Sequence, residues 1–307
     1  MAAQRVAGRV ENRVRGTGSP PGGAIALLRA GPRLTAARVL SVLVLALMLV
    51  QSLLGLLVPG LYPEQAWAIA ALRGNDLVTL AVVVPALALS LYLSATRASA
   101  TSVAVWLGLL FYGIYNYAYY AFGAAFSDVF LLHVATFSAS TYALILLGSS
   151  LRVEATAARI RTGPPARLVA AFTMLLGAGL VAAWGTLSVR FAVTGLLPVD
   201  VMPPQAVHLV YALDLGVLAP AFLLSGVLLW LCRPWGAVLA AAANVSAAAY
   251  LLVLEVGGGF QSNAGIGTAT WASAPAIGGT VLCLLAAVTL LTGKSRAGAP
   301  QGPSGTH

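Results

Sequence analysis

Long apolar runs dominate this sequence and leave few folds open to it. An α-helix rises 1.5 Å per residue, so about twenty residues cross the roughly 30 Å hydrocarbon core of a bilayer. We therefore predict an all-α fold, a polytopic integral membrane helix bundle of about eight transmembrane helices. The predicted spans are residues 38–59, 76–96, 103–124, 129–149, 168–187, 207–231, 235–256 and 272–292.

Composition agrees with a chain embedded in lipid. Hydrophobic residues make up 60% of the sequence and charged residues only 8%, with a mean hydropathy of +0.91. A soluble domain would carry about a quarter charged residues. The net charge of +9 would suggest a nucleic-acid partner in a soluble chain, but the arginines here follow the membrane topology. We expect the lipid bilayer as partner and no nucleic acid.

The basic residues also predict an orientation. Residues 1–36 form an arginine-rich tail that we expect to be disordered, residues 37–293 form the transmembrane domain, and residues 294–307 form a second tail. With both termini in the cytoplasm, only Arg73 and Arg190 fall on the outer side, as the positive-inside rule requires. We predict a multi-pass protein of the cell (inner or plasma) membrane, and the Ala-, Gly- and Arg-rich composition favours a bacterial source.

Two of the spans resemble each other. Asp76 is followed by Pro85 and Ser90, and Asp214 is followed by Pro220 and Ser225. The match favours two parallel four-helix repeats, although chance similarity between Ala/Leu-rich helices is an alternative. Proline lacks the backbone N–H, so Pro85 and Pro220 predict kinks in their helices.

Asp214 is the deepest acidic residue and the first candidate for a functional site. His208 and Tyr211 lie on the same broad helix face, at 100° per residue. An ionisable group inside a membrane span is costly and normally faces the bundle interior or a wet cavity. Asp214 is therefore a candidate proton carrier, cation ligand or general acid/base. The alternative is a structural carboxyl that is hydrogen-bonded to a neighbouring tyrosine.

Other polar residues gather toward the same outer half of the bundle. They predict an outward-facing polar cavity bounded by the second, third, fourth and sixth spans. For the acids nearest the surface, a solvated helix end is the alternative, and Asp76 with Asn75 would then cap the second span. The further candidates for ligand binding or proton coupling are His133, Tyr115, Asn116, Tyr119, Asp76 and Glu255.

Several kinds of site are not indicated. Cys232 and Cys283 form no CxxC pair, and no histidine spacing matches a metal motif, so we predict no metal and no cofactor. Every fourth position holds a small residue or an amide at Gly236, Ala240, Asn244 and Ala248, which is typical of close helix contact in membranes.

Three functions remain open at this point. The first is the binding or transport of a small or lipid-like ligand through the polar cavity. The second is an integral-membrane enzyme at the outer leaflet, with Asp214 and either His133 or His208 as acid and base. The third is a non-catalytic membrane subunit or assembly factor that packs against a membrane protein partner.

Overall fold

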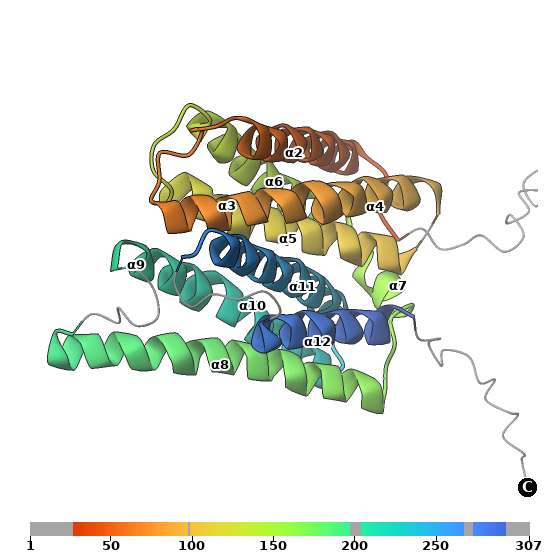
Figure 1. Cartoon of the computed structure of the whole chain (residues 1–307). Helices are drawn as coiled ribbons and strands as arrows, with labels where there is room; N and C mark the ends of the chain where they lie inside the picture. The colour runs from red at the N-terminus through yellow and green to blue at the C-terminus, as the bar shows by residue number, and fades with distance from the viewer. Residues whose placement is uncertain (1–26, 98, 197–203, 267–272, 293–307) are drawn as a thin grey trace, which may run out of the picture.

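The computed structural model describes residues 27–97, 99–196, 204–266 and 273–292 (Figure 1). Most of the predicted N-terminal tail and all of the predicted C-terminal tail lie outside these residues. Among the described residues most are helical, no strand is present, and the one β-bridge joins Leu28 and Leu151, so the all-α class is confirmed. The elements are α2 (Pro32–Leu57), α3 (Ala66–Val78), η1 (Thr79–Val83), α4 (Val84–Thr96), α5 (Ala100–Phe122), α6 (Phe130–Ser150), α7 (Val153–Ala157), α8 (Pro164–Thr194), α9 (Pro204–Leu213), η2 (Asp214–Leu218), α10 (Ala219–Trp230), α11 (Pro234–Asn263) and α12 (Ala274–Leu291).

Seven helices in the described chain are long and apolar enough to cross a membrane, which confirms a multi-pass bundle. They are Pro32–Leu57, Ala66–Thr96, Phe130–Ser150, Pro164–Thr194, His208–Trp230, Pro234–Asn263 and Ala274–Leu291. Helix α5 has 23 residues but is outside this group, because its tyrosines and Asn116 lower its hydropathy. The count of eight spans therefore stays a prediction.

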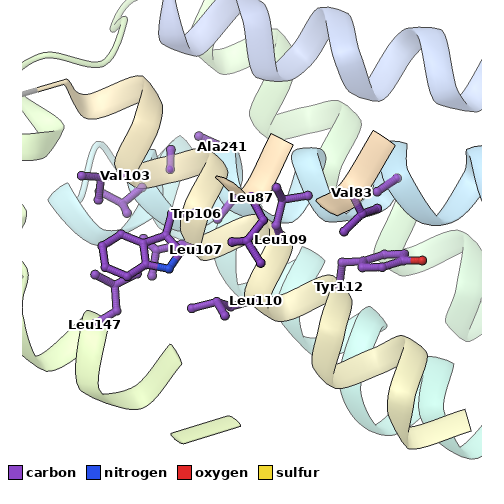
Figure 2. Close-up of a cluster of buried hydrophobic side chains, with 14 of the residues drawn as sticks. Val83, Leu87, Val103, Trp106, Leu107, Leu109, Leu110, Tyr112, Leu147 and Ala241 are labelled. Atoms are coloured by element: carbon purple, nitrogen blue, oxygen red, sulfur yellow. The ribbon is translucent and has the colours of Figure 1, made fainter. Parts of the chain in front are cut away.

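Helix α5 lies within the bundle and supplies much of its core (Figure 1). It packs against α4, α6 and α11, and 16 of its residues are buried. Trp106 is fully buried and donates a hydrogen bond from Nε1 to Ser41 Oγ over 2.9 Å. Figure 2 shows Trp106 among leucines and valines of this core. A helix surrounded by protein does not need the apolar surface that lipid demands, which explains its composition.

Three helices extend the furthest beyond the predicted spans. Helix α3 begins at Ala66, α8 continues to Thr194, and α11 continues to Asn263. The segments 60–75, 188–206 and 257–271, which the sequence predicts as loops, are therefore partly helical. Hydropathy marks the part of a helix that lies in hydrocarbon, whereas a helix can continue past it into the polar interface. The position of Asp76 changes as a result, because it lies ten residues beyond the start of α3.

A π-turn precedes each of the two prolines. The Val84 N–H bonds back to the carbonyl of Thr79, and the Ala219 N–H bonds back to the carbonyl of Asp214. Proline offers no N–H and its ring crowds the preceding turn, and a wider turn accommodates both effects. The predicted irregularities at Pro85 and Pro220 thus take the form of π-turns, and the helices continue on both sides.

The two π-turns and the two prolines are each separated by 135 residues, which supports the proposed repeat. The acids are not equivalent positions in that alignment. Asp214 is the first residue of its π-turn, whereas Asp76 lies three residues before its own. The residue that matches Asp214 in the first half is Thr79.

The two ends of the described chain meet at one end of the bundle (Figure 1). The Arg152 N–H donates to the carbonyl of Leu27, and the Arg161 N–H donates to the carbonyl of Leu290, each over 2.8 Å. The segments 151–163 and 231–233 lie at this end as well, so most of the described arginines gather there. The opposite end carries the α2–α3 and α5–α6 connections.

Candidate functional site

A cavity of about 190 Å³ lies between α3, α5, α9 and α11. The sequence predicts a cavity bounded by the second, third, fourth and sixth spans. The fourth span corresponds to α6, and its inclusion is wrong because α11 lines the cavity in its place. The reason is a close contact between glycines, because a Cβ on Gly74 would lie 2.5 Å from Gly257 Cα. Only glycine at residue 74 lets α11 approach α3 this closely.

A wider hollow of about 380 Å³ adjoins the cavity, at the end of the bundle away from the arginines. The two share Trp67, Ala68, Leu72 and Tyr119 in their walls. Glu64 and His208 line only the wider hollow, and Glu64 accepts a hydrogen bond from the Ala125 N–H. We call the wider hollow the vestibule. It gives the inner cavity an entrance lined by polar groups.

A chain of hydrogen bonds leads to the wall of the cavity and ends at Asn116. The hydroxyls of Thr79 and Tyr112 lie 3.2 and 3.0 Å from Asn75 Oδ1, and 2.8 Å from each other. At least one of them donates to that oxygen, so the Asn75 amide nitrogen points the other way. It donates to Asn116 Oδ1 over 2.7 Å.

Asn116 therefore presents its amide nitrogen without a partner among the described residues. Its side chain is 3% exposed and lines the cavity. A buried polar group without a hydrogen bond costs about 1–3 kcal/mol. The cavity wall therefore contains a residue whose donor is left unsatisfied.

The other side of the cavity is aromatic. Tyr115 and Tyr250 pack edge to face with ring centroids 4.7 Å apart, and both line the cavity. The Tyr115 hydroxyl donates to Asp214 Oδ1 over 2.5 Å, and Trp184 Nε1 donates to Asp214 Oδ2 over 2.7 Å. Asp214 thus lies behind the wall and holds Tyr115 in place.

Tyr211 packs beside this group rather than on the cavity. Its ring stacks on Trp184 with centroids 4.3 Å apart, and its buried hydroxyl has no partner among the described residues. The sequence predicts that His208, Tyr211 and Asp214 share one helix face, but they contact different parts of the structure. His208 lines the vestibule, while Tyr211 and Asp214 contact Trp184.

Asp76 belongs to a separate polar cluster on the other side of α3. It is 2% exposed, so the interpretation as a solvated helix cap is wrong. Its carboxylate accepts from the hydroxyls of Tyr62 over 2.6 Å and Tyr120 over 3.3 Å. Gln51 Nε2 donates to Tyr62 Oη over 2.8 Å. Burial, followed by the charge of Asp76, raises the pKa of Tyr62, so its hydroxyl stays a donor at neutral pH.

A glycine makes room for this cluster. A Cβ on Gly55 would lie 1.9 Å from Asp76 Oδ2 and 2.4 Å from Tyr62 Oη. The connection between α2 and α3 therefore reaches into the bundle through Tyr62 and covers Asp76 from that end.

His133 and Glu255 lie at two further positions. The His133 ring packs 4.7 Å from that of Tyr120, and its Nε2 has no partner in the described part of the chain. Glu255 is 8% exposed and accepts a hydrogen bond from the Ser273 N–H. The interpretation of Glu255 as a solvated helix end is wrong, because α11 continues for two more turns to Asn263.

The proposed acid and base do not meet. Asp214 contacts Tyr115 and Trp184, His133 contacts Tyr117 and Tyr120, and His208 lines the vestibule. The residues lining the inner cavity are uncharged. Within the described ranges, no three His, Cys, Asp or Glu side chains come together in a way that could hold a metal ion.

Sequence reasoning missed several residues that shape the site. They are Trp67, Thr79, Tyr112, Trp184 and Tyr250. The dipeptide Asn75-Asp76 was the available signal, because two strongly polar residues inside one apolar helix must face different partners. Trp184 reads as an interfacial anchor in the sequence, and only the packing of α8 against η2 shows its bond to Asp214.

The fold and its cavity define the class: a multi-pass membrane protein whose helices enclose a polar site. No family model, no curated protein and no solved structure matches the chain.

Proposed function

We propose that this protein binds a small uncharged ligand in the inner cavity and carries it through the membrane. The observation that supports the proposal is the unpaired amide nitrogen of Asn116 in the cavity wall. A ligand oxygen that accepts from this nitrogen restores the hydrogen bond that the folded chain leaves unmade.

The lining favours a particular ligand chemistry. The inner wall carries the side-chain amides of Asn75, Asn116 and Gln261 and the rings of Tyr115, Tyr119, Tyr250 and Trp67, but no charged group. The volume of about 190 Å³ is below the roughly 300–1,000 Å³ of sites for drug-sized ligands. The ligand is therefore a compact molecule with a carbonyl, ether or hydroxyl oxygen and an apolar or aromatic body.

The proposal includes a topology. Both described ends of the chain lie at the same end of the bundle, which requires an even number of crossings. Seven helices qualify by hydropathy, so we assign α5 as the eighth span. The arginine-rich end is then the cytoplasmic side of the cell membrane, and the vestibule opens on the outer side.

Movement of the ligand needs a change of shape, and the two π-turns are the places we assign to it. The π-turn η1 lies directly after the Asn75-Asp76 turn of α3, and η2 begins at Asp214. π-turns inside α-helices often occur at functional sites. Each half of the bundle thus has one adjustable turn beside a polar cluster next to the cavity.

The test uses Asn116→Asp. The new side chain still accepts from Asn75 but replaces the free donor with an acceptor oxygen. We expect small ketones and ethers, which can accept but not donate a hydrogen bond, to raise the thermal stability of the wild-type protein in mild detergent and to lose this effect in the variant. Ala68→Leu, at the junction of cavity and vestibule, should block binding as well.

The control is Tyr142→Phe, on the exposed face of α6, which should behave as wild type. Native mass spectrometry of the same samples would show any ligand that copurifies. A ketone or ether that stabilises wild type and Asn116→Asp equally would contradict the proposal.

A further inference from the structure

The largest hollow of those described lies at the opposite, arginine-rich end of the bundle and has no part in the proposed transport site. It measures about 500 Å³ and is bounded by α7, the start of α8, the end of α10 and the start of α11. Its floor is apolar, with Ala157, Ala166, Leu229 and Ala237. We call it the basic-end groove.

Two arginines line this groove. Arg167 and Arg233 are exposed, and they belong to the first turn of α8 and the residue before α11. The N-terminal ends of both long helices face the same space, and a helix N-terminus adds positive potential. Glu154 also lines the groove, and among the described residues no ion pair joins it to either arginine.

A second basic hollow adjoins the groove. Arg29 and Arg152 line it together with Glu154, which the two hollows share. Four arginines and one glutamate therefore line the two hollows, and the net charge of their lining is positive. The charge favours an anionic occupant.

Two tryptophans near the groove indicate its depth relative to the membrane surface. Trp230 and Trp235 flank Cys232 and Arg233 and are 48% and 42% exposed. Tryptophan collects at the level of lipid head groups. Leu231, between them, is 59% exposed. The groove thus lies where phosphate groups and the first part of the acyl chains meet the protein.

We propose that the basic-end groove is a binding site for an anionic phospholipid. Arg167 and Arg233 bind the phosphate, and the apolar floor takes the start of an acyl chain. Arginine binds phosphate oxygens through paired N–H donors, which suits this role. A free phosphate would leave the apolar floor uncovered, and a zwitterionic lipid would place a cationic amine next to the arginines.

The first test is native mass spectrometry of the full chain with phosphatidylglycerol or phosphatidylcholine added. We expect stoichiometric binding of phosphatidylglycerol that exceeds binding of phosphatidylcholine. The double variant Arg167→Gln/Arg233→Gln should weaken phosphatidylglycerol binding by about tenfold or more. Arg97→Gln is the matched control, because Arg97 is exposed at the end of α4 and does not line the groove.

The second test uses a natural probe. Cys232 is exposed and lines the groove, whereas Cys283 is fully buried. Maleimide should label Cys232 more slowly in phosphatidylcholine nanodiscs that contain phosphatidylglycerol than in phosphatidylcholine alone. The double variant should lose this protection while it keeps the wild-type thermal stability in phosphatidylcholine.

Three outcomes would overturn the proposal. One is equal binding of the two lipids by the wild-type chain. The second is wild-type phosphatidylglycerol binding by the double variant. The third is protection of Cys232 by inorganic phosphate as strong as that by phosphatidylglycerol, which would identify a simple anion site.

Discussion

The side-chain amide of Asn75 donates to Asn116 Oδ1 over 2.7 Å, and this bond decides which end of the Asn116 amide is left without a partner among the described residues. The oxygen of Asn75 is already held by the hydroxyls of Thr79 and Tyr112. The orientation of the Asn116 amide thus depends on the bonds that Thr79 and Tyr112 make to Asn75.

Asn75→Asp should reverse that polarity. A carboxylate cannot donate to Asn116 Oδ1, so Asn116 turns its nitrogen toward residue 75 and its oxygen toward the cavity. Ketones and ethers, which can only accept, should lose their stabilising effect in the thermal-shift assay, and primary amides and alcohols, which can also donate, should keep it. An unchanged ligand preference would show that the orientation of Asn116 is not controlled by Asn75.

Tyr115→Phe should destabilise the protein through Asp214. The substitution removes one of the two donors to the Asp214 carboxylate and leaves the aromatic wall in place. We expect a loss of about 1 kcal/mol in the free energy of unfolding, measured by denaturant titration in mixed micelles. Tyr142→Phe removes an exposed hydroxyl and is the matched control. Equal stability of the two variants would contradict the bond.

Gly74→Ala should separate α3 from α11. The added methyl would meet the backbone of Gly257 at 2.5 Å, which no side-chain rotation can relieve. We expect a loss of about 1–3 kcal/mol, seen as a lower melting temperature. Gly148→Ala, with nothing within 4 Å of the new Cβ, should be neutral or slightly stabilising. A Gly74→Ala variant as stable as wild type would disprove the close contact.

Gly55→Ala should loosen the connection that covers Asp76. The new Cβ would occupy the position of Asp76 Oδ2, so the Tyr62–Asp76 bond has to break or shift. Hydrogen exchange should become faster in residues 58–65 and stay unchanged in α12. Wild-type exchange in this segment would mean that Tyr62 does not hold it.

Topology can be read from cysteine labelling in intact cells. Cys232, at the arginine-rich end, should react with a membrane-impermeant maleimide only after permeabilisation. Asp128→Cys in a Cys232→Ser background should react without it, because Asp128 is exposed in the connection between α5 and α6. Labelling of Cys232 in intact cells would reverse the proposed orientation.

The helical membrane bundle could be predicted because hydrophobicity repeats on the length scale of the bilayer. The site was predicted less completely, and particular residues show why. Asn116 and Tyr115 stood out as polar groups in an apolar span, but which group each one bonds depends on how the helices are rotated against each other. Asp76 and Glu255 were placed at helix ends because hydropathy does not show that α3 starts at Ala66 and α11 ends at Asn263.

The π-turn of residues 79–83 determines the rotation, about the helix axis, of the residues of α3 that precede it. Each residue turns an α-helix by about 100° and advances it by about 1.5 Å. Deleting one residue from this turn would replace the π-turn ahead of Pro85 with a regular α-helical turn and rotate everything before it by that angle. Asn75 would then leave Asn116, and Asp76 would leave Tyr62, although no residue in contact had changed. The number of residues in the turn therefore decides which partners Asn75 and Asp76 meet.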